Sequence, residues 1–202
     1  MLARVRRNRV FELAFTAAVA LVLALAVQAY AVKPYRVPSE SMEPTLHAGD
    51  RVLVNRFAHH LGAQPEVRQI VVFHPPDGAD ASPPRCGRRP LPGSACSRST
   101  GRPSSQTYIK RVVGVAGDHI AVRDGQVVRN GRLQREPFTA DCGAAPECEL
   151  PQPVTTPRGS VFLMGDNRGA SADSRVWGPV PVSWVIGEAM LLYWPPRRAG
   201  TP

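Results

Sequence analysis

Lysine is nearly absent from this chain of 202 residues, although the chain is strongly basic. Only Lys33 and Lys110 accompany 23 arginines, and the formal net charge is +9 at pH 7. A GC-rich genome would produce the same arginine bias, so the bias alone assigns no function. A guanidinium stays protonated in proteins, whereas a buried amine can lose its proton. If the chemistry of this protein needs an amine base, one of the two lysines has to supply it.

Patterns typical of zinc sites and of nucleic-acid binding are also missing. The chain has no Cys-x-x-Cys pair, and its five histidines form no His-Glu-x-x-His or similar spacing. Its arginines are scattered without interleaved aromatic residues, which make up only 6% of the sequence. The sequence therefore predicts neither a metal site nor a nucleic-acid partner.

Proline, in contrast, is abundant, with 21 residues against a usual share of about 5%. This content disfavours a helical bundle and favours a mostly β, loop-rich fold with no internal repeat. Short apolar runs bounded by turn residues predict antiparallel strands near 51–54, 70–73, 108–115, 161–164 and 185–194, and a hairpin of strands 119–122 and 126–128 with turn dipeptides at 124–125 and 130–131. Between them we expect a long Pro/Cys-rich loop at about 74–107 and a smaller β excursion at about 119–158.

The N-terminal region combines basic residues with a long apolar run. Four arginines lie within residues 1–12, and no charged residue occurs over the 20 positions 13–32. As a helix this run would span ~30 Å, the thickness of a bilayer core. We expect a transmembrane anchor helix at 13–32, a cytoplasmic N-terminus and an extracytoplasmic domain at 33–202. The alternatives are a buried core helix and a signal peptide cleaved after Ala24-Leu25-Ala26 or Ala29-Tyr30-Ala31.

The four cysteines agree with export to an oxidising compartment. Cys86, Cys96, Cys142 and Cys148 form an even set, which in a translocated domain indicates disulfides. Four cysteines allow three connectivities, and sequence proximity favours Cys86–Cys96 and Cys142–Cys148.

Three stretches contain residues suited to catalysis: 38–46 (PSESMEPTL), 108–118 (YIKRVVGVAGD) and 165–175 (GDNRGASADSR). A serine hydroxyl becomes a good nucleophile only when a base takes its proton. None of the stretches contains a histidine, but Lys110 lies among apolar residues that would desolvate its amine and lower its pKa. Taken singly, each stretch is typical of a turn, an edge charge or a loop. Together and in this order, they favour a Ser-Lys hydrolase.

In these three stretches the chain resembles the bacterial type I signal peptidases, membrane-anchored serine proteases that remove signal peptides from exported preproteins. The resemblance implies that Ser41 is the nucleophile, Lys110 the general base, Ser39 an oxyanion-hole donor beside the Ser41 N–H, and Ser171 the residue that orients the lysine. It implies structural support from Asp166, Asp173, Arg111 and Arg175, and an apolar wall and substrate pocket built from Pro38, Met42, Leu46, Tyr108, Ile109 and Met164.

The resemblance further implies cleavage after small residues of the Ala-x-Ala type through an acyl-enzyme, without a cofactor, at the bilayer where the signal peptides lie. The rivals are other Ser-Lys hydrolases, a relative that matures conjugation proteins, and an inert membrane-tethered module. Self-cleaving repressors of the SOS response carry a DNA-binding domain, and penicillin-recognising enzymes need Ser-x-x-Lys. In this chain the N-terminal region is the expected membrane anchor. Lys110 follows Ser41 by 69 positions, so the two residues do not form a Ser-x-x-Lys motif.

Overall fold

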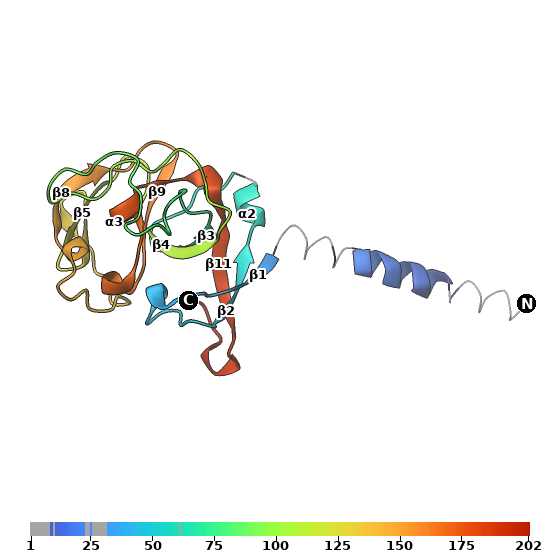
Figure 1. The fold of residues 1–202 in the computed structure, drawn as a ribbon. Helices are drawn as coiled ribbons and strands as arrows, with labels where there is room; N and C mark the ends of the chain where they lie inside the picture. The colour runs from blue at the N-terminus through green and yellow to red at the C-terminus, as the bar shows by residue number, and fades with distance from the viewer. Residues whose placement is uncertain (1–8, 10, 23–24, 26–31, 61) are drawn as a thin grey trace, which may run out of the picture.

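The computed structural model describes residues 9, 11–22, 25, 32–60 and 62–202 (Figure 1). The strands are β1 (Val32–Arg36), β2 (Arg51–Asn55), β3 (Ile70–Phe73), β4 (Tyr108–Gly114), β5 (His119–Arg123), β6 (Gln126–Arg129), β7 (Arg132–Leu133), β8 (Leu150–Thr155), β9 (Ser160–Met164), β10 (Val180–Pro181) and β11 (Val185–Trp194). Residues 9, 11–22 and 25 near the N-terminus are helical. The other helices are the short α2 (Phe57–His60) and α3 (Ser174–Trp177) and the 3-10 turns η1 (Glu40–Met42), η2 (Pro146–Cys148), η3 (Arg168–Ala170), η4 (Val182–Trp184) and η5 (Pro196–Arg198).

The main sheet has seven antiparallel strands in the order β1-β2-β11-β3-β4-β9-β10. Strand β4 lies inside this sheet, paired with β3 on one side and β9 on the other. Six of its seven residues are buried, including Lys110 and Arg111. A lysine in this strand is therefore held in the protein interior.

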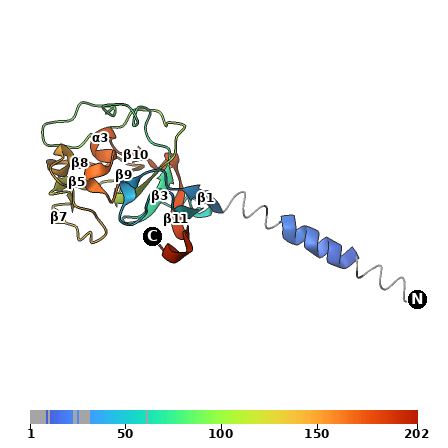
Figure 2. The ribbon, with the colours of Figure 1, turned by 60° about the horizontal axis from the view of Figure 1, so that its bottom comes forward.

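A second sheet of four strands, in the order β7-β6-β5-β8, lies on the side of the domain away from β1 in both views (Figures 1 and 2). Its hairpins turn at Asp124-Gly125 and Asn130-Gly131, and all four residues have positive φ angles. Two consecutive positive φ angles are the geometry of the tight turns that Asp-Gly and Asn-Gly favour. The mostly β architecture is the one that proline content and short strands predict.

The long loop between β3 and β4 contains a disulfide. Cys86 bonds to Cys96, and Cys142 bonds to Cys148 in the connection before β8. These are the pairs that lie nearest to each other in the sequence. In Figure 2 the loop runs as a green trace past α3, and the Cys96 N–H donates to the Arg175 carbonyl at 2.8 Å.

The prediction of a transmembrane helix at 13–32 is wrong for the structure as described. Helical residues 11–22 rise about 18 Å, whereas a bilayer core measures ~30 Å. Among the described residues, no helix has both the length and the apolarity needed to cross a membrane. Residues 23–24 and 26–31, which include the candidate cleavage site Ala29-Tyr30-Ala31 and both alanines of Ala24-Leu25-Ala26, lie outside the described part of the chain.

Candidate active site

Ser41 lies in the single turn η1, directly after the edge strand β1 and its exit at Val37 and Pro38. The turn is fixed from below, because the Met42 and Leu46 side chains are 0% exposed and pack in one core cluster with Val37 and Ile109. Ser41 itself lies on top of these core side chains and is 6% exposed. Core packing thus holds a serine at a defined point above the sheet.

Lys110 projects from β4 to the same point, although 69 residues separate it from Ser41. Its Nζ donates a hydrogen bond to the Ser41 Oγ at 2.5 Å. The Tyr108 ring lies beside the amine, with 5.9 Å between Nζ and the ring centroid. The sheet therefore brings the two candidate reacting groups into direct contact.

The protonation state of Lys110 follows from its position. Burial lowers the pKa of Lys110 from 10.5 to about 8, because an apolar interior disfavours the charged amine. The carboxylate of Asp173 acts in the opposite direction, and the guanidinium of Arg175 reinforces the lowering. A substantial fraction of the amines is therefore neutral near pH 8 and able to accept a proton.

Ser39 lies next to Ser41 and differs from it in exposure. The Ser39 hydroxyl donates to the Ser41 Oγ at 3.2 Å, and Ser39 is exposed. If a substrate carbonyl carbon bonds to the Ser41 Oγ, the Ser39 hydroxyl is close enough to donate a hydrogen bond to the resulting oxyanion.

Ser171 is placed differently from its implied role. Within the described residues, its buried Oγ has no hydrogen-bond partner, so no hydrogen bond joins it to Lys110. The oxygen instead lies against Gly165, where any side chain would overlap both the Ser171 Oγ and the Ser41 carbonyl oxygen. Glycine at this position lets the 165–171 loop approach the Ser41 turn closely.

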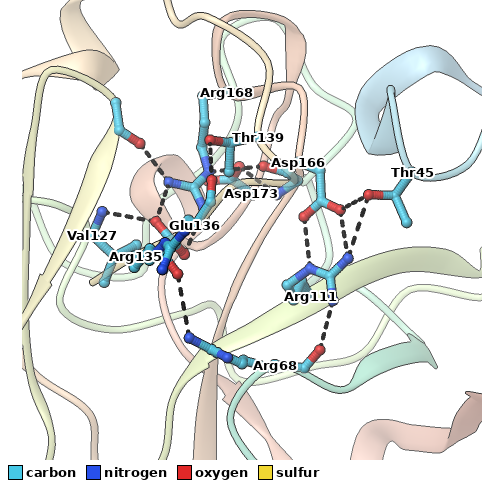
Figure 3. Close-up of polar contacts among 12 residues, drawn as sticks. Thr45, Arg68, Arg111, Val127, Arg135, Glu136, Thr139, Asp166, Arg168 and Asp173 are labelled. Carbon is cyan, nitrogen blue, oxygen red and sulfur yellow. Dashed lines mark hydrogen bonds and ion pairs between the residues drawn. The ribbon is translucent and has the colours of Figure 1, made fainter. Parts of the chain in front are cut away.

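Two buried ion pairs support the site from the 165–175 stretch. Arg111, the residue after Lys110, binds both Asp166 oxygens through Nε at 2.8 Å and Nη2 at 2.7 Å (Figure 3). Arg175 binds both Asp173 oxygens at 2.8 Å. Burial alone would raise the pKa of Asp173, but the Arg175 charge and its hydrogen bonds outweigh burial and lower it. Asp173 also accepts the Gly165 N–H at 3.1 Å.

Most of the expected pocket residues prove to be core residues. Met42, Leu46 and Met164 are 0% exposed and Ile109 is 5% exposed, so their side chains present no surface to a substrate. Their apolar character reflects packing beneath the site. Pro38 is exposed and Tyr108 is half-buried, so these two remain accessible at its rim.

Several residues that touch the site were not singled out from the sequence. Thr45 donates to the Asp166 Oδ2 at 2.5 Å. The Asn167 N–H donates to the Ser41 carbonyl at 3.1 Å, and its side chain donates to the Glu40 carbonyl at 3.3 Å. Both residues lie inside the recognised stretches, so the stretches indicated them without assigning a role. Glu136, which pairs with Arg168, carries no such signal.

A buried serine in contact with a buried, desolvated lysine defines the class of Ser-Lys hydrolases. The comparisons with known proteins narrow that class. The family model described as "Signal peptidase, peptidase S26" matches residues 10–194. The chain belongs to this family, and its function is that of a signal peptidase I, a serine endopeptidase.

Three relatives show the extent of the likeness. A probable signal peptidase I-1 of Synechocystis is 37% identical over 90% of this chain, which covers 81% of the length of that protein. The signal peptidase I of Mycobacterium tuberculosis is 34% identical, over 96% of this chain and 76% of its own. The thylakoidal processing peptidase 1 of Arabidopsis thaliana is 36% identical over 82% of this chain, which spans 43% of that longer protein.

Proposed function

We propose that Ser41 and Lys110 form the catalytic dyad and cleave signal peptides from exported preproteins after small residues. The observation that carries the proposal is the contact between the Lys110 Nζ and the Ser41 Oγ inside a buried site. Lys110 enters the reaction as the neutral amine and takes the Ser41 proton. The Ser41 oxygen then attacks the carbonyl carbon of the residue before the scissile bond.

The later steps use the same groups. The Ser41 N–H and the Ser39 hydroxyl bind the oxyanion, and one such donor contributes about 2.7–4 kcal/mol to transition-state stabilisation. Protonated Lys110 gives its proton to the leaving amine, and the Ser41 ester remains. Lys110 then activates a water molecule that hydrolyses the acyl-enzyme, so the cycle needs no cofactor. The Ser171 hydroxyl, which has no hydrogen-bond partner among the described residues, orients the Lys110 amine when substrate is bound.

We further propose that the domain formed by residues 33–202 works on the extracytoplasmic face of a bacterial cytoplasmic membrane. Two disulfides support an oxidising compartment. The described N-terminal helical residues expose large apolar side chains, including Phe11 at 72% and Leu13 at 71%, and a lipid bilayer would cover such surface. A substrate signal peptide lies in the same bilayer and crosses the site in extended form, as an added strand.

The first test is cleavage of a preprotein that carries an Ala-x-Ala site by detergent-purified wild type, Ser41→Ala, Lys110→Arg and Lys33→Arg. Loss of the general base should lower kcat by roughly 10²–10⁴-fold, because arginine stays protonated. Lys33→Arg is the matched control, since Lys33 is exposed on β1 and should behave as wild type.

Cleavage by Lys110→Arg at more than a few per cent of the wild-type rate would refute the dyad. A folded wild type that cleaves only a conjugation pilin precursor would indicate the specialised relative. A folded wild type that cleaves neither substrate in the presence of lipid would indicate an inert tethered module.

A further inference from the structure

The segment that follows β7 contacts the site from the second sheet. The Phe138 ring stacks on the Arg111 guanidinium, with 4.0 Å between the guanidinium carbon and the ring centroid. Two residues later, the Ala140 N–H donates to the Asp166 carbonyl at 2.9 Å. Residues 136–140 thus touch the arginine next to Lys110 and the loop that faces Ser41.

Glu136 makes the strongest contact of this segment (Figure 3). Its carboxylate accepts hydrogen bonds from the Arg168 Nη1 at 2.9 Å and Nη2 at 2.8 Å. Both side chains are almost fully buried, at 7% and 1% exposure. Glu136 also accepts the Val127 N–H at 3.0 Å, which ties it to β6. The Arg168 Nη1 also donates to the Gly125 carbonyl, so Glu136 and this carbonyl together hold the guanidinium. Glu136 supplies the only charge among these partners, and a buried guanidinium that loses its carboxylate is destabilised.

Arg168 passes this constraint to the residues around Ser41. Its Nε donates to the Gly165 carbonyl at 3.1 Å, while the Gly165 N–H is held by Asp173. Both peptide groups of Gly165 are therefore fixed, at a point where the chain touches the Ser41 carbonyl and the Ser171 Oγ. Gly165 packs so closely against the Ser41 carbonyl that a side chain there would overlap it, so the position of Gly165 bears directly on the nucleophile turn.

We propose that Glu136 is a positioning residue for the peptidase reaction. It acts through Arg168 to hold the 165–171 loop against the Ser41 turn. The proposal rests on the Ser41–Lys110 site of the proposed function. It gives the second sheet a part in the reaction, because β6 and the segment after β7 hold the carboxylate in place.

Glu136→Gln separates positioning from folding. The side chain keeps its size and one carbonyl oxygen for the Val127 N–H, but its amide group would face the Arg168 guanidinium without a negative charge. We expect kcat on the Ala-x-Ala preprotein to fall at least tenfold, with KM changed less than threefold. A loosened loop admits water to Lys110, so the pH at which kcat is half-maximal should also move upward.

Glu149→Gln is the matched control in the same sheet. Glu149 also accepts a backbone N–H, from Asp124 at 3.0 Å, but it is exposed and forms no ion pair within the described residues. Its kcat, KM and pH profile should equal those of wild type. Glu136 and Arg168 act as a unit. The double variant Glu136→Gln, Arg168→Gln should therefore lower kcat no further than the more damaging of the two single variants.

Glu136→Asp covers the case in which the glutamine variant does not fold. It keeps the charge, shortens the reach to Arg168, and should show the same changes in smaller measure. Wild-type kcat and an unshifted pH profile in a folded Glu136→Gln or Glu136→Asp variant would overturn the positioning role. Lower thermal stability with unchanged kinetics would overturn it as well. Failure of the proposed function is distinguishable, because wild type itself would then not cleave or Ser41→Ala would still cleave.

Discussion

At the scale of single residues, the proposed mechanism depends on one buried amine. Lys110 lies in an interior strand, is 4% exposed and has its Nζ against the Ser41 Oγ. Desolvation lowers the pKa of Lys110 to about 8, so part of the amine is already neutral near neutral pH, where a free lysine would be fully charged. The same burial excludes water that would compete with Ser41 for the amine.

The pH dependence of kcat follows directly from this burial. The reactive form of Lys110 is the neutral amine, so kcat should rise about tenfold per pH unit well below pH 8 and level off above it. The measurement is the initial rate of preprotein cleavage under saturating substrate from pH 5 to pH 10. A kcat that stays constant between pH 5 and pH 7 would contradict a lysine base.

The sequence indicated Ser41 and Lys110 as candidates, because few residue types can perform this step and lysine is scarce in the chain, and the structure brings the two side chains into contact. It was insufficient for Met42 and Leu46, which the resemblance placed in a substrate pocket and which the structure buries completely. An apolar residue near a nucleophile has the same sequence signature whether it faces the substrate or the core. Only the fold decides between the two.

At the scale of elements, the 165–175 stretch acts as a support whose charges are neutralised in pairs. Asp173 begins α3 by accepting the Arg175 N–H at 3.2 Å, and its carboxylate also binds the Arg175 guanidinium and the Gly165 N–H. The resemblance named both residues as structural support without saying how they pair. The partner of Arg168 could not be foreseen, because Glu136 is distant in sequence and only the second sheet brings it close.

Arg175→Gln tests how much this support contributes to stability. It leaves the Asp173 carboxylate buried without its cation, which should cost about 3–5 kcal/mol of the free energy of unfolding. Arg129→Gln is the control, because the Arg129 side chain is 31% exposed and its partner Asp118 keeps hydrogen bonds from Val115 and Asn130, so the pair should contribute ~1 kcal/mol or less. Urea unfolding of both variants beside wild type measures the difference.

Acid should reduce the cost of Arg175→Gln. The lowered pKa of Asp173 contributes stability that is present above its usual 3.8 and is lost as the pH falls through the lowered folded value. Without Arg175 that contribution is missing at neutral pH, and an unpaired Asp173 takes up a proton more easily. Equal losses for both variants at pH 7, or a loss for Arg175→Gln that grows in acid, would contradict the account.

At the scale of the whole molecule, two sheets and two disulfides converge on one small region. The main sheet supplies Lys110 and the turn that carries Ser41, while the second sheet reaches the site through residues 136–140. Both disulfides lie beside Arg175. The Cys96 N–H donates to the Arg175 carbonyl. The Arg175 Nη1 donates at 3.2 Å to the carbonyl of Glu147, which lies between the two cysteines of the Cys142–Cys148 disulfide. The additions to the main sheet therefore support the site as well as enlarge the domain.

The strand order and the role of the second sheet exceeded what the sequence could predict. Alternating apolar runs and Asp-Gly or Asn-Gly turns indicate strands and hairpins locally, but the pairing of β11 with both β2 and β3 joins segments more than 100 residues apart. A charge-free run is likewise a composition signal, and it led to the anchor helix that the described residues do not form.

The measurement that tests the central claim most directly is the identification of the acylated residue. Wild type would be mixed with an Ala-x-Ala peptide ester, quenched with acid within the first turnover and digested for mass spectrometry. The account predicts an acyl group on Ser41 in wild type and none at this residue in Lys110→Arg. Rapid turnover with an acyl group on another residue, or with none on Ser41, would contradict it.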